Sequence, residues 1–279
     1  MKLNGLLVAV RSASAILAVV FTLGAVGLLF IPTDAVFRIS AQTEALRLEP
    51  VTPPARAFRL ELARVFDAND ALLTECPLEV ETQAGAQLSL FRAGKEPLYL
   101  YVEPAQSGQQ GWQLRCDNGQ VFEGPDLSVS ALPPAGGRQV LLLTGAASIG
   151  ELPRFPGGEF FGLLEGEVQM ISSGFLGGAR SERKSSLDMG ESIRLRNDLG
   201  EPSPGFVTIF LDEAPGMSVR HQARARAASV FRFGGDREEQ RVLAPTWFER
   251  LEANVAWGLL PLLSWCLSSL LGLFGLSRE

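Results

Sequence analysis

Histidine, lysine and cysteine are scarce in this chain of 279 residues, which holds one histidine and three cysteines. A structural zinc site needs four cysteine or histidine ligands at defined spacing. His221 and the two cysteines of the central region, Cys76 and Cys116, cannot supply that set, and Cys266 falls in an apolar run near the C-terminus. Composition therefore predicts neither a metal site nor a cofactor.

Complete phosphate and calcium loops are also lacking. The segment 178–185, GARSERKS, matches a phosphate-binding loop except that Arg183 replaces the second glycine, which allows backbone amides to approach the phosphates. The segment 67–75, DANDALLTE, begins like a calcium loop, but Ala71 occupies the next ligand position. We expect a simple turn there, followed by solvated acids.

No nucleophile motif is complete. Ser148, Asp212 and His221 follow the chain order of an α/β-hydrolase triad. However, two prolines and a glycine pair directly after Ser148 prevent the helix that a nucleophile elbow requires. The segment 181–184, SERK, has the spacing of penicillin-binding enzymes, but it lies in a polar stretch, 172–191, that predicts an exposed loop or an extended hairpin tip. We therefore expect a protein that is not an enzyme.

The charge balance argues against nucleic-acid binding. The region 33–253 carries 22 basic and 30 acidic residues, a net charge of −8. A general nucleic-acid-binding domain has the opposite sign. The basic residues of this region are almost all arginines, with Lys95 and Lys184 as its two lysines.

Two long uncharged runs flank this region. Residues 12–31 form a run of 20 and residues 254–276 a run of 23 without a charged side chain. A helix needs about 20 such residues to cross a bilayer. We therefore predict an N-terminal transmembrane helix within 1–32, and within 246–279 a capped helix that starts near Trp247 and continues into a second span. A cleaved signal peptide is the alternative for the first run, and a buried core helix for the second.

Lys2 and Arg11 precede the first run, which favours a cytoplasmic N-terminus. Two spans then return both termini to one side and hold the central domain on the other. The prediction is a two-pass protein of a bacterial-type inner (cytoplasmic) membrane, with its main domain in the periplasm or outside the cell. In such a compartment Cys76 and Cys116 are expected to form a disulfide. Two separate buried thiols are the alternative.

Short segments with alternating hydrophobicity, separated by turn residues, predict a mainly β domain. The clearest is 112–124, where Asn118 and Gly119 favour a tight hairpin. Regular short strands favour a β-sandwich or jelly-roll-like fold. The segment 131–138, ALPPAGGR, marks a boundary that divides a first β lobe, 33–134, from a second, 135–245.

The segment 218–233, SVRHQARARAASVFRF, predicts one long strand with two different faces. His221 belongs to a small apolar face together with Val219, so we expect it to pack in the core. The opposite face carries a cationic row of Arg220, Arg224, Arg226 and Arg232. These arginines either pair with carboxylates of adjacent strands or bind an anionic group or a partner.

These observations predict a non-enzymatic scaffold or accessory subunit of an envelope membrane complex. It would contact one or more membrane proteins and the lipid bilayer, and no nucleic acid. One alternative is a sensor or binding domain for an anionic glycan or lipid. A second is an enzyme of unrecognised type that depends on Ser148 or His221.

Overall fold

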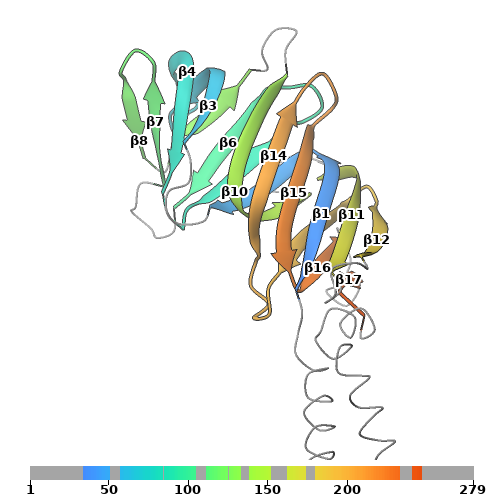
Figure 1. Cartoon of the computed structure of the whole chain (residues 1–279). Coiled ribbons are helices and arrows are strands. Elements are labelled where there is room, and N and C mark those ends of the chain that lie inside the picture. The colour runs from blue at the N-terminus through green and yellow to red at the C-terminus, as the bar shows by residue number, and fades with distance from the viewer. Residues whose placement is uncertain are drawn as a thin grey trace, which may run out of the picture. The chain divides into compact units, whose positions relative to one another are not determined.

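The computed structural model describes residues 34–50, 57–83, 85–104, 111–124, 126–132, 138–151, 162–173, 180–232 and 241–246. Within these ranges the chain consists of antiparallel strands without a helix, which confirms the predicted mainly β class (Figure 1). No helix long and apolar enough to span a membrane occurs in these ranges. The two predicted transmembrane runs, 12–31 and 254–276, lie outside the described residues.

The strands are β1 (Ala35–Thr43), β2 (Ala45–Pro50), β3 (Phe58–Phe66), β4 (Leu72–Thr82), β5 (Gln87–Phe91), β6 (Leu98–Glu103), β7 (Trp112–Cys116), β8 (Val121–Glu123), β9 (Ser128–Ala131), β10 (Gln139–Ile149), β11 (Leu163–Ser173), β12 (Arg180–Leu187), β13 (Glu191–Arg196), β14 (Pro204–Leu211), β15 (Met217–Ala225), β16 (Ala227–Arg232) and β17 (Arg241–Leu243).

One group of strands follows the hydrogen-bonded order β2–β5–β6–β9–β3–β4–β7–β8. Cys76 on β4 and Cys116 on β7 form a disulfide, with a Cα–Cα distance of 5.8 Å, which confirms that prediction. The predicted hairpin also forms, since β7 pairs with β8 and Gly119 has a φ of 86° in the connecting turn.

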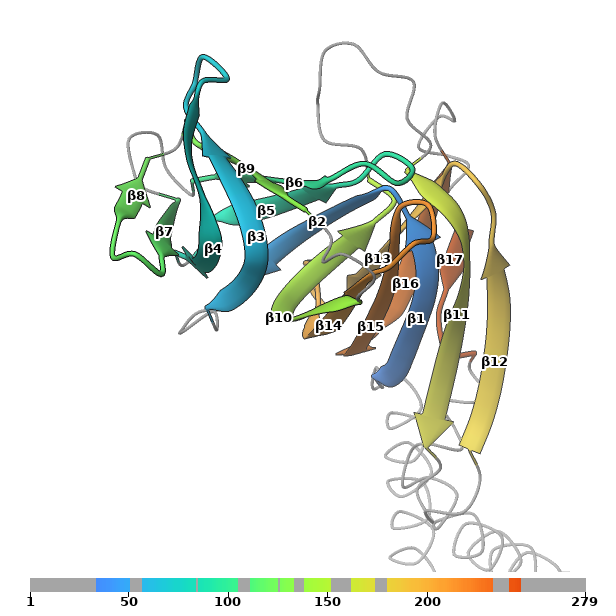
Figure 2. The same ribbon diagram turned by 90° about the horizontal axis from the view of Figure 1, so that it is seen from above.

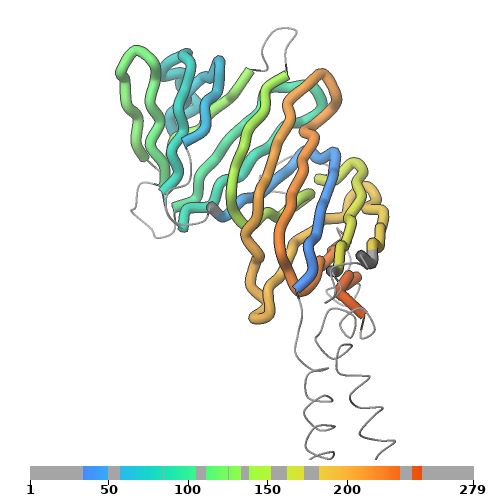
Figure 3. Tube along the Cα trace, viewed as in Figure 1, coloured from blue at the N-terminus to red at the C-terminus, as the bar shows by residue number. Residues whose placement is uncertain are grey.

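A second group follows the order β11–β1–β15–β14–β10. The long strand β10 curves, pairing with β14 over its first part and with β2 and β13 over its last residues (Figure 3). From β13 the pairing continues to β16 and β17. β12 runs beside β11 (Figure 2). Lys184 of β12 and Glu167 of β11 form an ion pair, with Nζ 3.2 Å from Oε1.

Strands β1 and β2 are consecutive in the chain but belong to different groups. β1 pairs with β11 and β15, whereas β2 pairs with β5 and β10. The crossing point is Thr43, whose buried hydroxyl donates to the carbonyl oxygen of Ala45 at 2.8 Å. Residues 34–171 and 182–244 form one compact unit. The division into lobes at 134 and 135 stays a prediction.

The buried guanidinium of Arg92, just after β5, ties this crossing to the β14–β15 hairpin. Its side chain is 2% exposed. Nε donates to the carbonyl oxygen of Glu96 at 3.0 Å, and Nη1 donates to that of Gly216 at 2.7 Å. The backbone N–H of Arg92 donates to the carbonyl of Glu44, at the β1–β2 junction. Arg92 therefore holds three chain segments together.

One expectation about local structure was wrong. The segment 218–233 is not one strand, because it bends at Arg226 between β15 and β16. β15 pairs with β1 and β14, whereas β16 pairs with β13 and β17. For the polar segment 172–191 the sequence left open an exposed loop or an extended hairpin tip. Residues 180–187 form strand β12 beside β11, with Glu182 and Lys184 exposed, which agrees with the second alternative.

Candidate functional site

The outward side of β10, β14, β15, β1 and β11 is an open surface, called the outer face below. Alternation brings outward side chains into rows across the paired strands. The central row consists of Leu142, Thr208, Arg220, Ser40 and Glu167. The rows on either side consist of Val140, Phe210, Ser218, Gln42 and Glu165, and of Thr144, Phe206, Gln222, Arg38 and Gln169. Apolar groups thus gather on β10 and β14, and arginines and polar groups on β15 and β1.

The structure brings two of the four predicted arginines together on the outer face. Arg220 and Arg224 both point outward from β15 and are exposed. Arg38, on β1, joins them opposite Gln222, between the two. Sequence reasoning missed Arg38 because strand pairing, not chain position, sets this proximity. None of these three arginines has an ion pair with a carboxylate among the residues described here.

The other two predicted arginines lie elsewhere. Arg226 lies in the bend, and its Nη1 is 3.5 Å from Oδ1 of Asp198. Arg232 is exposed at the end of β16, opposite Glu191 of β13. Pairing with a carboxylate, the alternative considered from the sequence, therefore applies to Arg226 within the described part of the chain. The bend separates both residues from the outer face because it changes the pairing partners of the strand.

An apolar strip borders the arginines. Phe206 is 73% exposed, Leu142 66% and Val140 45%, and all three lie on the adjacent strands β14 and β10. The ring of Phe210 contacts two cations: the guanidinium carbon of Arg138 is 4.0 Å from its centroid, and that of Arg220 is 5.4 Å away. Such cation–π contacts hold a guanidinium over a ring without neutralising its charge. The strip and the cations therefore form one continuous surface.

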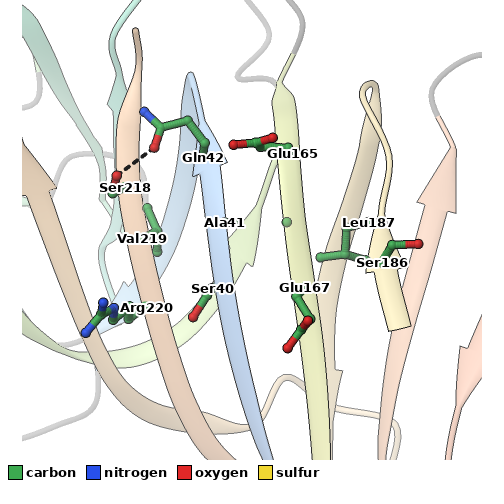
Figure 4. A pocket seen from close by; sticks show the side chains of 11 residues that line it. Ser40, Ala41, Gln42, Glu165, Glu167, Ser186, Leu187, Ser218, Val219 and Arg220 are labelled. Atoms are coloured by element: carbon green, nitrogen blue, oxygen red, sulfur yellow. Dashed lines mark hydrogen bonds between the residues drawn. The ribbon is translucent and has the colours of Figure 1, made fainter. Parts of the chain in front are cut away.

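Two hollows open on this side of the sheet. The larger, about 580 Å³, is lined by small and polar residues of β1, β11, β12 and β15, including Ser40, Glu165, Glu167 and Arg220 (Figure 4). At its rim Ser218 Oγ donates to Gln42 Oε1 at 2.6 Å. The second hollow, about 380 Å³, shares Ser40 and Arg220 with the first and adds Arg38 and Phe206. Both fall within the size range of small-ligand sites.

His221 packs on the inward side of β15, as the sequence predicted. It is 1% exposed and lies opposite Ile39 of β1 and Val207 of β14. Neither ring nitrogen has a hydrogen-bond partner among the described residues. Burial lowers the pKa of the imidazole to about 4, because desolvation penalises its charged form. The ring is therefore neutral at neutral pH.

Ser148, Asp212 and His221 come from separate parts of the fold. Ser148 lies on β10 opposite Arg47 of β2 and Arg194 of β13. Asp212 follows β14 five residues beyond Val207, the partner of His221, which is roughly 16 Å along an extended chain. Its carboxylate accepts a hydrogen bond from Ala214 N–H at 3.0 Å.

A charged network that the sequence did not predict surrounds Ser148. Glu151 accepts from Nε of Arg194 at 3.0 Å, and its other carboxylate oxygen lies 3.7 Å from Nη1 of Arg47. Arg47 reaches Glu103 on its far side, at 3.3 Å. These arginines come from strands that pair with opposite edges of β10, so the network reinforces the point where the two strand groups meet.

The segment 67–75 contains the predicted turn. Oδ1 of Asp67 accepts hydrogen bonds from the backbone N–H of Ala71 and of Asn69, both at 2.8 Å. These bonds lower the pKa of the Asp67 carboxyl, the bond from Ala71 having the largest effect. No group of three histidine, cysteine, aspartate or glutamate residues that could hold a metal ion occurs within the described ranges.

Comparison of the chain with protein-family models, with curated proteins and with solved structures finds no significant match.

Proposed function

We propose that this protein is a non-enzymatic accessory subunit, anchored in an envelope membrane at both ends, whose β domain binds a membrane partner protein through the outer face. The observation that carries the proposal is the apolar strip of Val140, Leu142 and Phe206 beside three arginines without a carboxylate partner among the described residues. Aromatic and arginine side chains supply most of the binding energy in protein interfaces.

The path of the chain supports anchoring at both ends. β1 begins at Ala35, which lies opposite Ala225 at the end of β15. β17 ends at Leu243, which lies opposite Ala228 of β16. Since Ala225 and Ala228 are three residues apart, the chain enters and leaves the sheets at neighbouring points. This arrangement suits two spans in one membrane, and the disulfide suits a periplasmic or extracellular domain.

The arrangement of the sheets supports the finer interpretation of the fold as sandwich-like. β13, β16 and β17 pair in a separate series from β14, β15, β1 and β11. Inward residues of both series, such as Ile193 and Ile209, are fully buried in one core. Such a core fixes the strands that carry the outer face, so this face is presented to a partner as a rigid surface.

The experiment is mild-detergent purification of the full chain from native membranes, with quantification of each co-purifying protein. We expect a stoichiometric membrane protein that is lost in the double variant Leu142→Asp and Phe206→Asp. Leu72→Asp is the matched control, since Leu72 is 55% exposed on β4, away from the outer face. A partner retained by the double variant, or a wild-type protein recovered alone, would overturn the proposal.

An anionic glycan or lipid ligand is the second candidate. It is favoured by the second hollow, where Arg38 and Arg220 converge beside the exposed Phe206. Binding of sulfated or uronate-containing oligosaccharides should then weaken as salt increases and fall several-fold in Arg38→Gln or Arg220→Gln. Arg226→Gln and Arg232→Gln serve as controls because these residues lie off the outer face. Equal loss in all four variants would contradict a specific site.

A further inference from the structure

The two turns that flank β13 have the same local form and expose an apolar residue at the tip. Asp188, Met189 and Gly190 precede the strand, and Asp198, Leu199 and Gly200 follow it. Gly190 has a φ of 78° and Gly200 a φ of 79°. Met189 is 56% exposed and Leu199 80%, the highest value among the exposed large hydrophobic residues described.

The two tips lie at opposite ends of the six-residue strand β13, about 20 Å apart at 3.3 Å per residue. The Leu199 turn lies at the end where the chain enters and leaves the sheets. Arg226 N–H donates to the carbonyl of Arg196, the last residue of β13, at 2.8 Å. The neighbouring residue Ala225 pairs with Ala35, where β1 begins.

Few residues separate this end from the first apolar run in the sequence. The run ends at Ile31 and the described chain begins three residues later, at Asp34. Three residues reach at most about 11 Å. If the run spans a bilayer, as the proposed function requires, then Asp34 and the adjacent end of the sheets lie within the lipid headgroup layer or directly above it.

Exposed acids lie at this end, among them Asp34, Asp198 and Glu201, and the arginines beside them supply the cations that can meet lipid phosphates. Arg224 is exposed and has no ion pair with a described carboxylate, and Arg226 is ion-paired with Asp198 at the turn itself. Asn197 fixes the shape of the turn, since its Oδ1 accepts from the N–H groups of Leu199, at 3.0 Å, and Glu201, at 2.9 Å. An apolar tip on a rigid turn beside arginines combines the two features of membrane-surface binding: apolar insertion and cationic contact with headgroups.

We infer that the β13–β14 turn contacts the membrane surface, with Leu199 inserted among lipid headgroups and Arg224 beside lipid phosphates. The inference rests on the proposed membrane anchoring and adds the side of the domain that faces the lipid. It also gives the exposed Leu199 a role distinct from that of the outer face, whose apolar strip lies on β10 and β14.

The test uses the full chain in nanodiscs of phosphatidylcholine, with and without an equimolar share of phosphatidylglycerol. A nitroxide is attached at Leu199→Cys or, as the matched control, at Met189→Cys, both in a Cys266→Ser background that keeps the native disulfide. Power saturation measures access of oxygen and of a water-soluble nickel chelate to each label. We expect nickel access at position 199 to be several-fold lower than at position 189, and Arg224→Gln to raise it in the anionic discs.

Equal nickel access at both positions in protein that elutes with the discs overturns the inference and leaves the anchoring intact. Protein that remains in the aqueous fraction without discs overturns both the membrane anchoring and the contact of Leu199 with the membrane surface. Low nickel access at position 199 that does not change with Arg224→Gln or with lipid charge supports insertion of Leu199 and overturns the headgroup contact of Arg224.

Discussion

The imidazole of His221 lies against Gly205 on the neighbouring strand, so closely that a Cβ at Gly205 would be 2.9 Å from Nε2. The same Cβ would be 2.3 Å from the carbonyl oxygen of Gln222. The absence of a side chain at one position therefore makes room for a buried ring at the other. This pair joins β14 to β15, directly beneath the outer face.

Gly205→Ala should destabilise the fold strongly, because the clash involves a backbone carbonyl that cannot move without disturbing the sheet. We expect a loss of about 3 kcal/mol, at the upper end of the range for overpacked cores. The control is Gly166→Ala in the same strand group, where the nearest atoms would be 3.1 Å away. Urea unfolding of the two variants measures the difference; equal losses would contradict the argument.

Stability should fall in mild acid because of His221. Its pKa is about 4 in the folded protein, and an unfolded histidine has a pKa of about 6.5. Below pH 6.5 the unfolded chain therefore binds a proton that the folded chain does not. The contribution of His221 to the free energy of unfolding is present above this pH and is lost as the pH falls towards 4. The expected loss between pH 7 and 5 is about 2 kcal/mol, as an order of magnitude.

The variant His221→Leu isolates this effect, since its apolar side chain suits the neighbouring Ile39 and Val207. Unfolding free energies at pH 7 and pH 5 should differ less in the variant than in the wild type. An unchanged pH dependence would show that other groups cause the acid loss.

Replacing Arg92 should be far more damaging than replacing an exposed arginine. Arg92→Met leaves the buried carbonyl of Gly216 and the partly buried carbonyl of Glu96 without their donors, at a cost of about 3 kcal/mol. Arg59→Met is the control, because Arg59 forms an exposed ion pair with Asp117. The side chain of Arg59 is 63% exposed and that of Asp117 is 48% exposed. Exposed pairs contribute at most about 1 kcal/mol. Equal melting temperatures of the two variants would contradict the role of Arg92 in holding three chain segments together.

Loss of the disulfide should destabilise the β3–β4–β7 region. Cys76 and Cys116 are 40 residues apart in the chain, and closing a loop of that length stabilises a fold by about 4 kcal/mol in the chain-entropy model. The double variant Cys76→Ala and Cys116→Ala should unfold at a lower urea concentration than the wild type, and a reducing agent should destabilise the wild type but not the double variant. Cys266→Ala serves as the control and should behave as the wild type.

Local patterns in the sequence were enough to predict some of the elements of this protein. Alternation over Val219 to Arg224 predicted which side of β15 is buried, because period two is a property of the strand itself. Asn118 and Gly119 predicted a hairpin because their backbone preferences act over a few residues. The cysteine pair predicted the bridge from composition and number, without knowledge of the strands that carry it.

Strand pairing, which depends on the whole chain, decided which residues become neighbours in the folded protein. It joined Arg38 to Arg220 and Arg224 across β1 and β15, and the bend at Arg226 removed Arg226 and Arg232 from that group. It also set Ser148 between two arginines rather than beside a histidine. Residues far apart in sequence meet through backbone hydrogen bonds whose register the burial of one face selects, and no local pattern encodes that choice of partner.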